Sequence, residues 1–595
     1  MTSPIDTKGS ASDLRLEDAE PPSDLQAHSG VTKIEAAHKV YGKWSKWILF
    51  GSMAVGAFVY SLERTTTYQY LAWAASDLND HSRIATIEIA RAVITSCGKP
   101  PIAKLADVSS RGTAYAVMLV FYVVGYIIVA ASKNISTLGA GMIISTIGFT
   151  GISLLGDIVI ADNTTLKWRG VASGLLATPY IINAFVGSVV AASILERASW
   201  RWGYGMFTII APAVMAPMVG ILLWSERKAK LFLASKGVVE HHSTKPTHIR
   251  LWHTFEKFDF LGLLLLAGSI SLILLPLTLA SAAKGGWHNA SMIAMVTIGA
   301  ILFPVFIFYE MRFAKYPVMA NRFLRNRGVI LIALIGFFDF ISFYITSTYL
   351  YSFVVVVKTW PLVYMNLFSQ IQTLGLCIFG LVAGILQRFT HRSKMPLILG
   401  IAIRLIGCGL MIHSRGANAS DAEIVISQIL QGSGGGITVV AMMTTAQASV
   451  PHVDVATVIA FVSLLTEIGG AIGNGISGAV WTKMMPEKMA QHLPFLDATQ
   501  RAELFASIAN AAANPRGDPI REGVINAYGD VMKILCIIAT VFAVPPLIIA
   551  FFVPNWYLGD QQNAIDNVNL SGERVHNPDV KDSVAESRDG SDLKP

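Results

Sequence analysis

The chain has 595 residues, of which 53% are hydrophobic and 14% are charged, and its mean hydropathy is +0.53. Soluble globular proteins carry about 25% charged residues, so this composition excludes an ordinary soluble protein and indicates a membrane protein. The net charge of +7 would also suit a nucleic-acid-binding protein, but Lys and Arg gather in alternate loops. The positive-inside rule explains that distribution, so we expect no nucleic-acid partner.

The chain begins with a polar segment, residues 1–45, that is rich in Ser, Asp and Pro. It contains no apolar run of the kind found in signal peptides, so we expect no cleavable signal and a disordered cytoplasmic tail. Residues 554–595 become similarly polar, and we expect them to form a second cytoplasmic tail.

Between the tails lie fourteen apolar stretches, each long enough to cross a bilayer, which takes about 20 residues. Because the bilayer core offers the backbone no hydrogen-bond partner, these stretches must be helices. The first six are 46–74, 84–104, 114–132, 137–161, 170–195 and 202–224. A basic loop, 225–258, precedes two more at 259–280 and 290–310, and the last six are 329–356, 361–387, 395–413, 423–447, 455–481 and 531–553. The sequence therefore predicts an all-α membrane protein with 14 spans.

The basic loops predict the orientation of the chain. They are the loops that hold Lys99, Lys104 and Arg111, together with those at 167–169, 225–258, 311–328 and 388–394. Basic loops face the cytoplasm, and an even number of spans puts both termini on that side. The long loop 482–530 is then outside, where Asp497 is placed to cap a short helix and the loop could cover the outer mouth.

An internal repeat organises the spans. A shift of 281 positions places TTTYQY, residues 65–70, on TSTYLY, residues 346–351, and it also places Arg111 on Arg392 and Gly151 on Gly432. The constant offset over four spans predicts two six-helix bundles, 46–224 and 329–553, with 259–310 as two extra central spans. Repeats of this kind place the substrate site between the halves, near the bilayer midplane.

Several motifs resemble those of known transporters. The segment GKPPIAKLADVSSRG, residues 98–112, is similar to the loop motif of the major facilitator superfamily, with Asp107 and Arg111 at its Asp and last Arg. The motif is degenerate, because Ala103, Val108 and Ser110 replace its two Gly and its middle Arg. The stretches LERTTTYQY, DIVIADNTTLKWRG, WRWGYGMF, SQILQGSGGG and PNWYLGDQQNA, with others, resemble the fungal siderophore-iron transporter family of that superfamily.

This resemblance implies a 14-span major facilitator fold and uptake of ferric siderophore chelates driven by proton entry. The closest rival is a proton-driven exporter or exchanger of a toxin, drug or glutathione. The fifth span reads ATPYIINAFVGSVV and lacks the Gly-Pro and Gly-Gly pairs usual in drug–proton antiporters, which weakens that rival. A non-transporting nutrient receptor would need more than these low-complexity tails to signal. An enzyme is the least favoured alternative, since the sequence contains no nucleophile, metal or cofactor motif.

Carboxylates within the spans are candidates for proton coupling. An ionisable group there costs roughly 2.5–3.5 kcal/mol on insertion scales, so each needs a reason. The candidates are Glu63, Glu88, Asp157, Asp339 and Glu467. The structural alternative is ion pairs that hold helices together, and Glu88 and Arg91, three residues apart on one helix face, suit either role. Arg404 stands alone in its span, and Asp339 and Glu467 are both possible partners.

Aromatic and cationic residues on the first, ninth and eleventh spans are candidates for substrate binding. A bulky chelate needs a wide cavity with aromatic walls and a few polar anchors. The candidates are Arg64, Tyr68, Tyr70, Phe343, Tyr344, Tyr349 and Arg404. Packing or an interfacial belt is the alternative role for the aromatic residues. Gly432, Gly434, Gly435 and Gly436 would serve close backbone approach to a substrate or helix packing equally well.

Three residues at cytoplasmic helix ends, Asp107, Arg111 and Arg169, are candidates for a gate, with ordinary positive-inside topology as the alternative. We expect no cofactor and no protein metal site, because the siderophore already surrounds the iron with oxygen atoms. We expect a monomer in a lipid bilayer whose partners are protons and an iron-loaded siderophore. The plasma membrane is the favoured location, with endosomal vesicles as the alternative.

Overall fold

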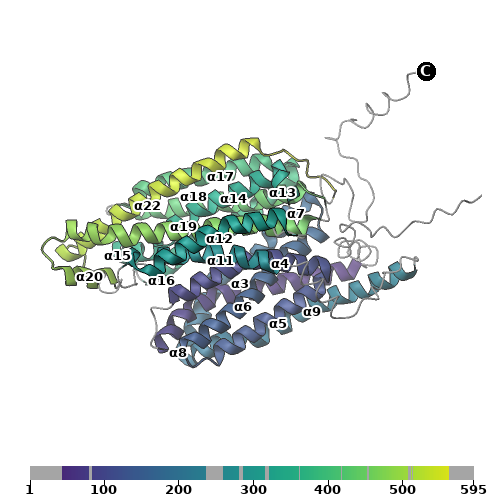
Figure 1. Ribbon diagram of the computed structural model, residues 1–595, viewed down its shortest axis with the longest axis horizontal. Helices are drawn as coiled ribbons and strands as arrows, with labels where there is room; N and C mark the ends of the chain where they lie inside the picture. The colour runs from purple at the N-terminus through teal and green to yellow at the C-terminus, as the bar shows by residue number, and fades with distance from the viewer. Residues whose placement is uncertain are drawn as a thin grey trace, which may run out of the picture.

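The computed structural model describes residues 43–78, 84–235, 259–279, 286–314, 321–360, 362–416, 419–451, 454–506, 511 and 513–561. Long helices run side by side along one axis of the molecule (Figure 1). Across these described ranges the structure is helical, and the one isolated β-bridge joins Arg392 and Tyr557. The prediction of an all-α protein is confirmed.

The first half of the chain forms six long helical segments. They are α3 (Lys43–Asp77), α4 (Ile84–Val108), α5 (Arg111–Ala130), α6 (Ile135–Asn163), the pair α7 (Leu166–Ala177) and α8 (Pro179–Arg197), and α9 (Trp200–Ser235). The sequence predicts one unbroken span over 170–195, but the helix breaks at Thr178. The interruption falls directly before Pro179, because a proline has no amide hydrogen to donate to the helical ladder. Thr178 itself keeps helical backbone angles (φ −56°, ψ −36°), so α8 continues directly from α7.

Two central helices, α11 (Phe260–Leu279) and α12 (Ala290–Arg312), precede the second half. That half contains α13 (Asn321–Arg325), α14 (Arg327–Ser347), α15 (Leu350–Val357), α16 (Leu362–Thr390), α17 (Lys394–Ser414), α18 (Asp421–Ala448), α19 (Val455–His492), α20 (Ala498–Ala506) and α22 (Pro519–Phe552). Eleven helices among the described residues are long and apolar enough to cross a membrane. Helices α3, α4 and α11 occupy the other three predicted spans.

The predicted loop 482–530 is shorter than expected. Helix α19 continues to His492, and α22 already begins at Pro519. The predicted short helix is present as α20, and the Asp497 carboxylate accepts a hydrogen bond from the Gln500 amide at 2.7 Å. Asp497 therefore caps this helix as the sequence indicates.

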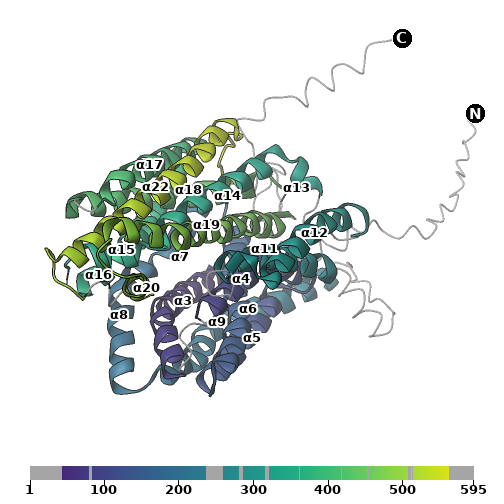
Figure 2. The same ribbon diagram turned by 60° about the vertical axis from the view of Figure 1, so that its left-hand side comes forward.

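The helices pack as two groups that meet along two seams. Within the first group α3 packs on α8 and α9, and α5 packs on α6 and α9; within the second, α14 packs on α19 and α22, and α18 packs on α16 and α17. The groups meet where α4 lies against α19 and where α7 and α8 lie against α16. Helices α11 and α12 pack on each other, and α11 contacts both α4 and α19, so this pair covers the first seam (Figure 2).

Glycines in α18 allow close contacts with two neighbouring helices of the second half. A methyl group at Gly436 would overlap the Leu376 carbonyl oxygen of α16, and one at Gly434 would lie 2.6 Å from the Gly400 carbonyl oxygen of α17. Gly435, between them, has nothing within 4 Å of a built Cβ atom. Packing on two neighbouring helices therefore accounts for Gly434 and Gly436, and only Gly435 lacks such a contact.

This difference gives a matched test of helix packing. Gly436→Ala should destabilise the protein by roughly 1–3 kcal/mol through overpacking. Gly435→Ala should be neutral or stabilising, because Ala favours a helix over Gly by about 1 kcal/mol where space allows. The measurement is thermal unfolding of the purified protein in detergent. Equal effects from the two variants would contradict this packing.

Candidate functional site

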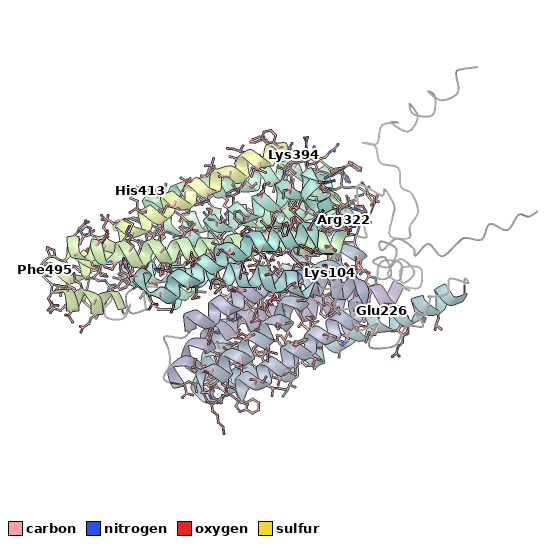
Figure 3. All side chains as sticks on the ribbon, in the orientation of Figure 1. Lys104, Glu226, Arg322, Lys394, His413 and Phe495 are labelled. Atoms are coloured by element: carbon pink, nitrogen blue, oxygen red, sulfur yellow. The ribbon has the colours of Figure 1, made fainter. Side chains whose placement is uncertain are left out.

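The helix ends that carry Lys104, Arg111, Arg169, Arg322 and Lys394 form what we call the basic end of the molecule. Figure 3 shows Lys104, Arg322 and Lys394 toward that end together with Glu226, and Phe495 at the opposite end. The opposite end carries α20 and the turn before α22 (Figure 1). The positions of the cavities and charges are described relative to these two ends.

A cavity of about 270 Å³ lies within the first half, among α3, α5, α6, α7, α8 and α9. Arg64, Tyr60, Tyr180 and Asp157 contribute to its wall. Arg64 is exposed and lines the cavity, so part of its exposed surface faces the cavity. The guanidinium is close enough to Tyr60, Tyr180 and Tyr344 to interact with them electrostatically.

Aromatic rings lie next to Arg64 at this cavity. The Arg64 guanidinium lies 5.8 Å from the Phe149 ring centroid, and the Tyr60 ring stacks on Phe149 with centroids 4.2 Å apart. Tyr344 comes from α14 of the second half, so Arg64 lies where the two halves face each other. A cation with aromatic and hydroxyl neighbours can bind the carbonyl or carboxylate oxygens of a large organic ligand.

A smaller cavity of about 150 Å³ lies between the halves and shares Asp157, Ser173 and Ala177 with the first. Its other wall comes from α16 and α18, with Gly380 and Gly436 among the lining residues. Asp157 is therefore at the junction of the two cavities. It is the one predicted coupling carboxylate, among those whose side chains the structure describes, that lines either cavity.

Glu63 lies beside Arg64 in sequence but points away from both cavities. Its carboxylate is buried, accepts a hydrogen bond from the Tyr126 hydroxyl and lies 3.3 Å from the Thr67 hydroxyl. Arg91 of α4 is close enough to act on it electrostatically. Glu63 therefore forms part of a polar cluster inside the first half.

Arg404 and Asp339 form a buried ion pair inside the second half. Arg404 donates to the Asp339 carboxylate and, at 2.7 Å, to the Asp339 carbonyl oxygen, and its guanidinium lies 5.6 Å from the Phe343 ring centroid. The two side chains are 3% and 4% exposed. Of the two partners that the sequence leaves open, Asp339 is the observed one. Neither Arg404 nor Asp339 lines either of the two cavities.

Glu467 pairs instead with Lys99, at 3.2 Å, across the seam between α4 and α19. Lys99 lies within α4, which continues to Val108, so the prediction that it belongs to a loop is wrong. Lys99 lies one position before Pro100 and Pro101 within the helix. This is an ion pair between the two halves, and the sequence alone does not indicate it.

The remaining candidates for substrate binding lie in packed surroundings or outside the described side chains. Tyr70 is fully buried, with its ring centroid 5.7 Å from that of Tyr204. Tyr349 stacks on Trp481 at 4.1 Å, and Tyr344 packs edge-on against Phe343 at 5.1 Å. The backbones of Tyr68 and Glu88 lie in α3 and α4, and their side chains are outside the described part of the structure.

The predicted gate residues gather at the basic end. Arg111 binds Asp107 at 2.6 Å and Asp162 at 2.9 Å, and all three are largely buried. Arg169 donates to the carbonyl oxygens of Ala161 and Thr164 at 2.8 and 3.1 Å. The motif residues therefore tie together the ends of α4, α5 and α6, with Asp162 as a partner that the motif does not include.

Close packing between the halves accompanies this cluster. Gly174 of α7 meets α16 so closely that a methyl group there would lie 2.7 Å from the Leu381 Cα atom. A methyl group at Gly384 of α16 would overlap the Gly170 carbonyl oxygen. The two helices therefore touch backbone to backbone, and the second seam is closed at the basic end.

Sequence reasoning missed Tyr60, Tyr180, Lys99 and Asp162. Tyr60 lies three residues before Glu63, and Tyr180 follows the Pro179 break, so both were visible as aromatic residues near polar ones. Asp162 directly follows the predicted span 137–161, where an acidic residue at the membrane interface is ordinary. The pairings depend on which way each helix faces, which apolar spans without strong periodicity do not indicate.

The family model of the Major Facilitator Superfamily matches residues 53–473. The chain is 36% identical over 551 residues to the low affinity heme transporter str3 of Schizosaccharomyces pombe, covering 91% of this chain and 87% of that protein. It is 34% identical over 576 residues to the siderophore transporter fer7 of Mycosarcoma maydis, covering 92% and 86%. It is 33% identical over 545 residues to the siderophore iron transporter mirC of Emericella nidulans, covering 91% and 90%.

The motif at the basic end, the two-half architecture and the matches over nearly the whole chain agree. This chain belongs to the fungal siderophore-iron transporter family of the Major Facilitator Superfamily.

Proposed function

We propose that the protein imports an intact iron-loaded siderophore and that proton entry drives the import. The observation that carries the substrate assignment is the cavity around Arg64, which has one exposed cation, tyrosine hydroxyls and a stacked aromatic wall. Such a cavity suits a large organic ligand that presents carbonyl or carboxylate oxygens. The names of the siderophore transporters similar to this chain support the same substrate class.

The proposed topology adds α3, α4 and α11 to the eleven candidate spans, which makes fourteen. The basic end then faces the cytoplasm together with both termini, as the positive-inside rule requires. The bundles 46–224 and 329–553 would move as the two halves of an alternating-access transporter, with 259–310 as the extra central pair. We propose that the protein works as a monomer, in the plasma membrane first and in endosomal vesicles as the alternative.

Intact chelates fit this site better than free iron does. Ferric ion would need a compact set of oxygen ligands, whereas Glu63, Asp339 and Glu467 each engage a different protein partner. Among the described residues, no group of three or more His, Cys, Asp or Glu side chains is arranged to hold a metal ion. The iron would therefore enter with its organic ligand.

Heme is the second candidate substrate, because a relative with 36% identity is named a heme transporter. Heme is also a large ferric chelate, with carboxylates that Arg64 could bind and a flat surface that aromatic rings could contact. The two substrates differ in how much of the iron the organic ligand surrounds. They can be separated by direct competition.

The substrate prediction is tested with gallium, which replaces ferric iron in siderophores and resists biological reduction. Cells that lack other siderophore carriers should accumulate gallium and a labelled siderophore in equal amounts when they express this protein. Excess heme should compete weakly. Entry of the metal without its labelled ligand would contradict import of the intact chelate, and uptake of heme alone would assign the protein to its rival substrate.

Coupling is assigned first to Glu63, whose buried carboxylate lies one residue from the exposed Arg64. Protonation of Glu63 would remove a negative charge that acts on Arg64 and Arg91 and so change how the site holds an anionic ligand. Asp157, at the junction of the two cavities, is the second proposed coupling residue. Glu88, Asp339 and Glu467 remain proposals, and in the structure Asp339 pairs with Arg404 and Glu467 with Lys99.

Glu63→Gln should uncouple transport, because the side chain keeps its shape and can no longer titrate. One proton moving through 100 mV gains about 2.3 kcal/mol, enough for roughly 50-fold accumulation, and the variant should lose that concentrating power. The measurement is accumulation of labelled chelate by vesicles with an imposed proton gradient. Glu423→Gln, at the half-exposed start of α18, is the matched control. If the Glu63 variant concentrates substrate like its parent, this coupling site is wrong.

A further inference from the structure

Residues 554–561, which follow α22, do not leave the protein as a free tail. The sequence predicts that they belong to a cytoplasmic tail, and PNWYLGDQQNA within this region resembles a family motif. In the structure they form a strap across the basic end, and Leu558 within it is completely buried. Transport of a chelate through the cavity does not by itself explain this arrangement.

The strap is anchored to its own half of the molecule. The Leu558 amide donates to the His391 carbonyl oxygen at 2.9 Å, and the His391 ring stacks on Tyr557 with centroids 5.3 Å apart. The Trp556 indole donates to the Ser449 hydroxyl at 2.8 Å. Arg392 adds a hydrogen bond to the Asn555 carbonyl oxygen at 3.1 Å. The strap therefore joins the α16–α17 turn to the end of α18.

The strap also reaches the first half, at the start of α7. The amide of Leu166 donates to the Gln561 carbonyl oxygen at 3.0 Å, and that of Lys167 to the Gly559 carbonyl oxygen at 3.1 Å. The first amides of any helix lack partners within it. The cap residue Thr165 makes no side-chain hydrogen bond to them, so the strap carbonyls take the role of a cap.

Leu558 is the point where the two halves and the strap meet. It packs with Leu166 of the first half and Ala448 of the second, and all three are completely buried. One and two turns further along α7, Gly170 and Gly174 touch α16 backbone to backbone. The strap therefore fastens the halves beside the contact that closes the second seam.

We infer that residues 554–561 are a latch that stabilises the state in which the basic end is closed. This inference rests on the proposed alternating access of the two halves. For the basic end to open, α7 must separate from α16, and α7 would carry Leu166 and Lys167 away from the strap. The strap is covalently joined to α22 and bound to His391, Arg392 and Ser449, so the contacts with α7 are those that break.

The test measures the opening of the basic end in the purified full-length chain, with spin labels on Arg227→Cys of α9 and Met395→Cys of α17. Both positions are exposed, and they lie on opposite halves. The four native cysteines, all buried, are changed to alanine. Leu558→Ala removes a buried leucine from the closed state only, so it should raise the ratio of open to closed molecules by roughly tenfold or more.

Leu166→Ala approaches the same junction from the other half and should shift the distances in the same direction. Leu231→Ala, at an exposed leucine on α9, should leave the distance distribution unchanged. If both junction variants fold and show the distances of the parent, the latch is refuted. No siderophore is present in this measurement, so its result does not depend on whether the assigned substrate is right.

Discussion

A charged side chain among apolar helices needs an opposite charge or polar groups inside the protein. The arrangement of the helices depends on how each charged side chain meets that need. In water an unpaired carboxylate costs nothing, whereas within a span it costs several kcal/mol. Arg404 and Asp339 pair with each other within the second half. Lys99 and Glu467 do so across the seam between the halves. Arg64 is left with an exposed surface in a cavity, and this is what makes it available to a ligand.

The two halves therefore differ in how they use charge. The repeat aligns Glu63 with Tyr344, so a carboxylate in the first half corresponds to a neutral phenol in the second. The cavity of about 270 Å³ belongs to the first half, while the second supplies Tyr344 and a rigid ion pair. At the basic end, glycines bring α7 and α16 into backbone contact, and the strap crosses beside them.

The sequence predicts what depends on local composition. Apolar length predicts the positions of the helices, and a carboxylate before a polar helix predicts the Asp497 cap. It misses the extension of α19 to His492, because a bilayer span and its helix need not end together. It also overlooks the interruption before Pro179 within the fifth span. It also leaves the partner of Arg404 open and misses Lys99–Glu467. These pairings depend on the rotation and tilt of long helices, which nearly uniform apolar sequences do not record.

Arg64 and its tyrosines are the proposed binding site of a ferric chelate. The most direct measurement is equilibrium binding of a gallium-loaded siderophore to the purified protein, before and after Arg64→Gln. A charge-assisted hydrogen bond contributes roughly 1.5–3 kcal/mol, so affinity should fall at least about tenfold while thermal unfolding stays the same. Arg201→Gln, beside Asp77 at the far end of α3, is the control and should bind as the parent does. Unchanged affinity in a folded Arg64 variant would contradict the account.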